Sequence, residues 1–274
     1  TFGAVFTLYQ KETETTLKKK RVKAQEKAEK DKSTVEYPTF DELKAEKLED
    51  KAQLIWIIRN AAGKEIKRLT SSPKKGITRV SWNLRAQTTS PITLKVKKPG
   101  RYSDPDDGFL VTPGTYSVEV VQLKDGALTT IAEKTSFKVN ELNNRTIKAD
   151  DVAALEAFRS EVAELTRSVD GTGRLMGETK EKLDLIEHAI KTYPGTDMTL
   201  LSEVESLKNL YYDLSVDLWG DGIRSTHQFE TEPSISGRIG IVSYQLYGSR
   251  TGVTATHRKN KAVSYTHLRA HETT

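Results

Sequence analysis

The sequence predicts a β sandwich of the immunoglobulin or fibronectin III type with a charged helical insertion, followed by an antiparallel three-helix bundle. Residues 77–84 and 116–120 alternate apolar with polar side chains, as strands with one solvated face do. After residue 143 the apolar spacing changes to three and four residues, which is typical of amphipathic helices. We therefore expect the sandwich over residues 1–142 and the helical bundle over residues 143–222.

Turn signals divide the first part into about seven expected strands. The run at 53–59 is almost continuously apolar and suits the middle of a sheet, and Pro113-Gly114 is a turn that precedes the strand of Tyr116. The strands are expected at 2–9, 53–59, 65–69, 77–84, 92–96, 116–120 and 135–139. Their predicted core between two sheets consists of Ile55, Ile57, Trp82, Tyr116, Val118 and Phe137.

A charged segment at about 11–50 interrupts the strands. It is rich in helix formers and poor in apolar residues, and Thr39 or Asp41 can cap a second helix in it. The basic cluster Lys18–Arg21 admits a nucleic-acid or nuclear-targeting hypothesis. The whole chain, however, has 43 basic residues against 38 acidic ones. This balance favours a solvated helical insertion, and we expect neither a nucleic-acid nor a membrane partner.

The helical part should contain three helices, the first capped by Asp150 or Asp151. Turns are expected at Gly171-Thr172-Gly173 and at Pro194-Gly195. Residues 223–262 are expected to form an irregular tail leading to a truncated fourth helix that starts at Thr254 or Thr256. Without that helix, an apolar strip along residues 150–220 should stay uncovered, so we expect the chain to self-associate there.

Several of these segments together resemble one bacterial module. Residues 63–69 followed by 75–85, Pro113-Gly114-Thr115-Tyr116, the helix opening near 142–144, and 233–240 resemble the region after the β-propeller in secreted BNR-repeat or sortilin-like proteins labelled glycosyl hydrolases. The resemblance spans roughly residues 1–260. It implies a secreted, periplasmic or extracellular protein and an upstream propeller in the same polypeptide.

Residues 263–274 are similar to something else. Val263-Ser264-Tyr265-Thr266-His267 and the residues after it resemble translated sequencing-adaptor read-through. We expect this tail to be an artefact without function, and the chain to be a fragment of a longer protein.

Few side chains suggest chemistry. His267 and His271 have zinc-ligand spacing, with His257, His227 or His188 as a third ligand, but the tail makes a metal site an unfavoured hypothesis. Asp104, Asp106 and Asp107 could bind calcium, yet they lack the spacing of a calcium loop, and a solvated turn is favoured. Trp56 and Trp82 could stack on sugars, although their place inside apolar strands favours core packing.

No catalytic motif emerges, and the chain has no cysteine. The prediction is therefore no catalytic, cofactor-binding or metal residue, and a non-catalytic accessory and interaction region of a secreted multidomain β-propeller protein. The expected partners are the propeller and a glycan or protein. Two alternatives stay open. One is a carbohydrate-binding module. The other is part of a glycoside hydrolase whose active site lies on the propeller, in which case residues 104–107 or Tyr102 would face that domain.

Overall fold

The computed structural model of the chain describes residues 3–92, 108–142, 151–248 and 251–272. It divides into two compact units, which are described separately. The β unit comprises Thr1–Gln87 and Pro113–Leu142, and the helical unit comprises Thr88–Thr112 and Asn143–Thr274. The chain therefore passes from one unit to the other three times.

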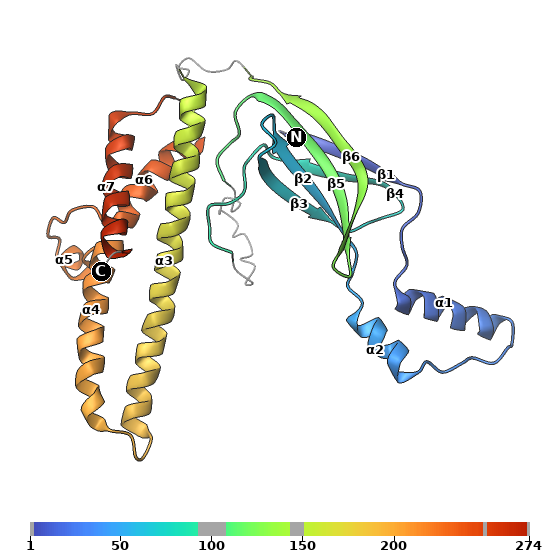
Figure 1. Ribbon diagram of the computed structural model, residues 1–274, viewed down its shortest axis with the longest axis horizontal. Coiled ribbons are helices and arrows are strands. Elements are labelled where there is room, and N and C mark those ends of the chain that lie inside the picture. Colours follow the sequence, from blue (N-terminus) through green and yellow to red (C-terminus); the bar gives the residue numbers. More distant parts are fainter. Residues whose placement is uncertain (1–2, 93–107, 143–150, 249–250, 273–274) are drawn as a thin grey trace. The chain divides into compact units, whose positions relative to one another are not determined.

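The β unit contains two antiparallel sheets (Figure 1). The smaller sheet pairs β1 (Ala4–Gln10) with β4 (Gly76–Trp82), so that Ala4 lies opposite Trp82. The larger sheet has the order β3-β2-β5-β6. Its strands are β2 (Gln53–Asn60), β3 (Glu65–Ser71), β5 (Gly114–Lys124) and β6 (Ala127–Val139).

Aromatic rings join the two sheets. The ring of Phe6 on β1 lies 6.2 Å from that of Trp56 and 5.3 Å from that of Phe137. The ring of Trp82 on β4 lies 5.7 Å from that of Tyr116 and 6.1 Å from that of Phe137. The Phe6–Trp56 pair is stacked and the other three are edge-to-face. Both arrangements stabilise a core beyond the area they bury.

The predicted core of the β unit is partly wrong. Trp82, Tyr116 and Val118 are buried, but Ile55, Ile57 and Phe137 are only half-buried. In β2 the buried side chains are those of Leu54, Trp56 and Ile58. Because residues 54–58 of β2 are all apolar, the sequence pattern could not indicate which face of the strand points into the core.

The predicted fold class is also wrong. The chain is about 49% helix and 23% strand, with sheets of only two and four strands. This does not fit a seven-stranded sandwich followed by three helices. In the described residues, Ile92 of the strand expected at 92–96 lies outside any strand, and the rest of that strand lies outside the described residues.

The insertion between β1 and β2 forms α1 (Leu17–Lys30) and α2 (Phe40–Leu48) (Figure 1). Thr39 caps α2 as predicted, accepting a hydrogen bond from the Glu42 backbone N–H while the Glu42 side chain accepts one from the Thr39 N–H. This reciprocal pair satisfies two backbone donors that the helix itself leaves without partners.

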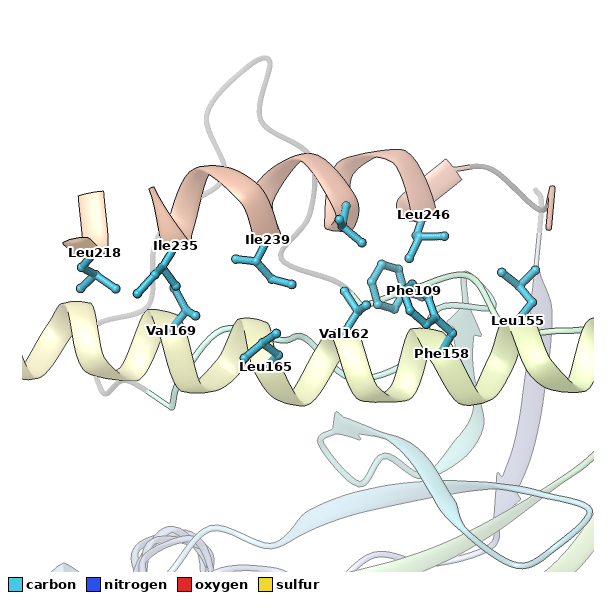
Figure 2. Close-up of a cluster of buried hydrophobic side chains, with 11 residues drawn as sticks. Phe109, Leu155, Phe158, Val162, Leu165, Val169, Leu218, Ile235, Ile239 and Leu246 are labelled. Carbon is cyan, nitrogen blue, oxygen red and sulfur yellow. The ribbon is translucent and has the colours of Figure 1, made fainter. Parts of the chain in front are cut away.

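The helical unit is built on α3 (Val152–Thr192), capped by Asp151, which lies antiparallel to α4 (Leu201–Trp219) (Figure 1). A 3₁₀ turn (Met198–Leu200) precedes α4, and α5 (Gly222–Thr226), α6 (Ile235–Gly248) and α7 (Ala255–Glu272) follow. Figure 2 shows Ile239 and Leu246 of α6 pointing toward α3, with Phe109 beside them. The buried cluster consists of Phe109, Leu155, Phe158, Val162, Leu165, Val169, Leu218, Ile235, Ile239, Val242 and Leu246.

Three features of this unit correct the predicted bundle. Gly171-Thr172-Gly173 is not a turn, because α3 continues through it. The tail expected to be irregular contains α6, which supplies four residues of the core cluster. The fourth helix begins after Thr254 as predicted, but it continues through the expected tail to Glu272 as α7, in which Ser264 is fully buried. None of the described helices is long and apolar enough to cross a membrane.

The segment before β5 belongs to the helical unit rather than to the β unit. Phe109 joins the helical core, and Thr112 donates a hydrogen bond of 2.8 Å to Glu156 on α3. The buried Arg159 guanidinium donates to the carbonyl oxygens of Leu110 and Leu246. Arg159 therefore ties this segment and the end of α6 to α3.

Candidate interaction site

An apolar groove of about 450 Å³ lies between α3 and α4. It is open to solvent: Leu175 is 61%, Leu207 50% and Leu210 55% exposed. Among the described residues that line it, Asp217 is the only charged one. Its main apolar side chains are Leu175, Met176 and Leu183 from α3 and Leu207, Leu210, Tyr211 and Leu214 from α4.

The spacing of these residues explains the groove. Leu175, Thr179 and Leu183 follow one another at intervals of four, and Leu207, Leu210 and Leu214 at intervals of three and four. Residues so spaced share one face of a helix. Both faces turn toward the same side of the hairpin, and the cavity between them is only partly filled.

An ion-pair group fixes α3 against α4 near the turn of the hairpin. Glu187 on α3 contacts Lys191 on the same helix at 2.8 Å and Lys208 on α4. Lys208 also lies 3.9 Å from Asp184, which pairs with Lys180 at 2.7 Å. Hydrogen bonds from Lys191 and Lys208 lower the pKa of Glu187 to about 2, so this carboxylate stays ionised in neutral solution.

Two further contacts set the geometry of the hairpin. Gly195, with φ of +92°, makes the turn after Pro194 that was predicted from the sequence. The Trp219 ring lies beside Gly173, where a Cβ would meet it in ordinary van der Waals contact at 3.5 Å. The indole therefore packs directly on the backbone of α3 where α4 ends.

The exposed leucines indicate what this site can do. Soluble monomers rarely leave a contiguous apolar strip open to water, and such strips commonly contact another protein. A groove between two helices accepts apolar side chains of a further helix or of another hairpin. The site offers apolar contact, and no set of groups for acid–base chemistry lines it.

The tryptophans considered as sugar platforms are buried. Trp56 is 2% and Trp82 1% exposed. The Trp56 indole N–H donates to the Ser71 hydroxyl at 2.9 Å, and that of Trp82 to the Arg85 carbonyl at 2.8 Å. Neither ring can stack on a sugar in this structure.

The histidines considered as zinc ligands are scattered. His188, His227 and His267 are exposed, and the side chain of His271 lies outside the described residues. His257 is buried, where its Nδ1 accepts from the Thr254 backbone N–H and its Nε2 lies 2.7 Å from Gln245 Oε1. In the described ranges, no three His, Asp or Glu side chains are placed to hold a metal ion together.

The remaining candidates cannot be placed. The acidic turn at 104–107 and Tyr102 lie outside the described residues. Sequence reasoning predicted an apolar strip over 150–220 from helical seams that include Met176, Leu183, Leu207, Tyr211 and Leu214, but it missed Leu175 and Leu210. Heptad spacing at Leu207, Leu210 and Leu214 could have located the groove on α4.

Comparisons with known proteins give no relative. No family model matches the chain, no curated protein matches it, and no solved structure matches it.

Proposed function

We propose that this chain is a non-catalytic accessory and interaction region of a secreted multidomain protein, in which a β-propeller of the BNR-repeat or sortilin-like glycosyl hydrolase type precedes it. The propeller context rests on the resemblance of residues 63–85, 113–116 and 233–240 to that family. The role in interaction rests on the groove of α3 and α4. In the isolated chain, a second copy covers this groove.

The exposed groove is the observation that carries the proposal. Leu175, Leu207 and Leu210 keep half or more of their surface in solvent, although each belongs to a regular helix of the hairpin. Exposure of three neighbouring leucines costs free energy that burial against a partner recovers. The chain also has a sheet core without exposed tryptophans, which suits a spacer better than a binding face for sugars.

Two measurements test the proposal. Sequencing the genomic region on both sides of the reading frame should reveal propeller repeats upstream, and a catalytic domain of another type in that place would overturn the assignment. The purified chain should release no product from a panel of glycans. Turnover that disappears when a pair of carboxylates is replaced by amides would show that the region is catalytic.

A further inference from the structure

Helix α1 has an unusual distribution of charge. It contains seven basic residues and only two acidic ones, Glu26 and Glu29. Lys19, Lys23 and Lys27 follow one another at intervals of four, and Lys30 comes three residues later, so all four share one face. We call these four residues the lysine stripe. At 1.5 Å per residue it extends for about 16 Å.

The stripe faces solvent because the opposite side of α1 meets α2. Arg21 Nε lies 2.5 Å from Glu46 Oε1, and Arg21 also donates to Gln25. All four lysines of the stripe are exposed. Within the described part of the chain, no carboxylate forms an ion pair with any of them.

This arrangement costs stability. Like charges four residues apart repel one another on a helix, and cations are unfavourable near a helix N-terminus. The first turn of α1 carries Lys18, Lys19 and Lys20 and has no acidic residue. Lys27 and Lys30 lie in the last turn, where cations are favourable, so the cost falls on the first half of α1. A local rule broken in this way is typical of a functional surface.

The insertion is nevertheless held in place at its base. Thr16 caps α1, and the Leu17 backbone N–H donates to Glu49 at 2.7 Å. Lys124, next to the β5–β6 turn, pairs with Glu14 at 2.7 Å and lies 3.7 Å from Glu49. The stripe is thus presented on a helix whose N-terminal end is fixed. Less conformational entropy is then lost when a ligand binds.

We propose that the lysine stripe binds a linear anionic polysaccharide through its carboxylate or sulfate groups. The positive charge of the stripe favours an anion as its ligand. Because the four lysines form a single row, a linear chain can contact all of them. Residues 31–50, which include α2, contain seven acidic and three basic residues. The insertion is therefore nearly neutral beyond the Debye length of roughly 8–10 Å, which disfavours attraction to a broad membrane surface or a duplex.

The composition of α1 also favours a polysaccharide over single-stranded nucleic acid as the ligand. Proteins that bind single strands place aromatic side chains among the basic ones, so that bases can stack. Helix α1 contains no aromatic residue. Its stripe contains lysine alone, which acts as a point charge and does not require the bidentate geometry of arginine. This inference goes beyond the proposed function and does not depend on it.

The test measures binding of the full chain to polygalacturonate and to sulfated dextran by calorimetry, with neutral dextran as the blank. The test variant is K19Q/K23Q/K27Q, since glutamine retains helix propensity and removes the charge. The matched control is K134Q/K138Q/K259Q, which removes the same charge from exposed lysines elsewhere. We expect the stripe variant to bind about 10- to 100-fold more weakly and the control to bind as the wild type does.

Other outcomes would overturn the inference. If both triple variants lost the same binding affinity, the polysaccharide would be attracted by the net charge of the chain and not by the stripe. Tighter binding to oligothymidylate, polyglutamate or anionic vesicles than to either acidic polysaccharide would assign the stripe to another partner. Circular dichroism should show unchanged helix content in the stripe variant, because its substitutions remove repulsion, so a loss of binding cannot be attributed to unfolding. No binding by the wild-type chain at 50 mM salt would refute the proposal.

Discussion

Replacing Leu175, Leu207 and Leu210 by glutamine should abolish self-association of the isolated chain while leaving its fold intact. These side chains are 61%, 50% and 55% exposed. Complete burial of a leucine contributes roughly 1.5–3 kcal/mol, so covering the exposed half adds about 0.75–1.5 kcal/mol for each. Two grooves that meet across a two-fold axis bury six such side chains, worth about 5–9 kcal/mol in total.

Association has its own cost, which sets the strength of the dimer. Loss of translational and rotational freedom opposes binding by at least about 4 kcal/mol. At the upper end the net free energy is about 5 kcal/mol, which corresponds to a dissociation constant on the order of 100 µM, and this is the strength that we expect. Light scattering and sedimentation between about 10 and 500 µM span this range. We expect the apparent mass of the wild type to rise with concentration.

A matched variant separates the groove from general hydrophobicity. Leu48, Leu128 and Leu185 are 68%, 66% and 66% exposed and do not line the groove. Their triple replacement by glutamine should leave self-association unchanged, and neither triple variant should lower the melting temperature by more than a few degrees. A wild type that stays monomeric at 500 µM, or a groove variant that still associates, would refute the reasoning.

Three further predictions concern stability. Trp82→Ala should cost about 3–5 kcal/mol in urea unfolding, because it removes the ring that contacts Tyr116 and Phe137; an unchanged midpoint would contradict the burial of this side chain. Arg159→Met should cost about 2 kcal/mol or more, because it removes the guanidinium that donates to the carbonyl oxygens of Leu110 and of the buried Leu246; an unchanged midpoint in urea would disprove this role. Burial lowers the pKa of His257, so the folded chain keeps a neutral ring where the unfolded chain binds a proton. Stability should therefore be constant above about pH 6.5 and fall as the pH drops from there through the folded pKa, with a shallower fall in His257→Gln.

The sequence predicted individual elements better than their assembly. The caps at Thr39 and Asp151, the turn at Pro194-Gly195 and the burial of Trp82 and Tyr116 are confirmed. Each depends on local chemistry, such as a hydroxyl or carboxylate that accepts a backbone hydrogen bond. The number of strands and helices was wrong because it depends on how segments distant in sequence pack.

Helix α6 shows where the pattern was misread. Ile235, Ile239 and Leu246 recur at helical spacing, but two glycines and a preceding proline suggested irregular chain. Burial against α3 outweighs the low helix propensity of those glycines. Phe109 illustrates the same limit, since nothing local indicates that a residue before β5 packs among helices. The groove was predicted only as a strip over 150–220, because the positions of α6 and α7 decide which part of it remains uncovered.

The continuity of α3 through Gly171-Thr172-Gly173 can be tested by whether Gly171→Ala stabilises or destabilises the chain. A turn at Gly171 would require positive φ, and alanine would then destabilise the chain. In a continuous helix, alanine should instead stabilise it by about 0.5–1 kcal/mol, because it restricts the unfolded chain. A Cβ at Gly171 meets nothing within 4 Å, so new side-chain contacts do not contribute to the change in stability. Gly195 is the matched control, since it also has open space around it but adopts φ of +92°. Urea denaturation should show a higher midpoint for Gly171→Ala and a lower one for Gly195→Ala. Lower midpoints for both variants would support the turn at Gly171 that the sequence predicted.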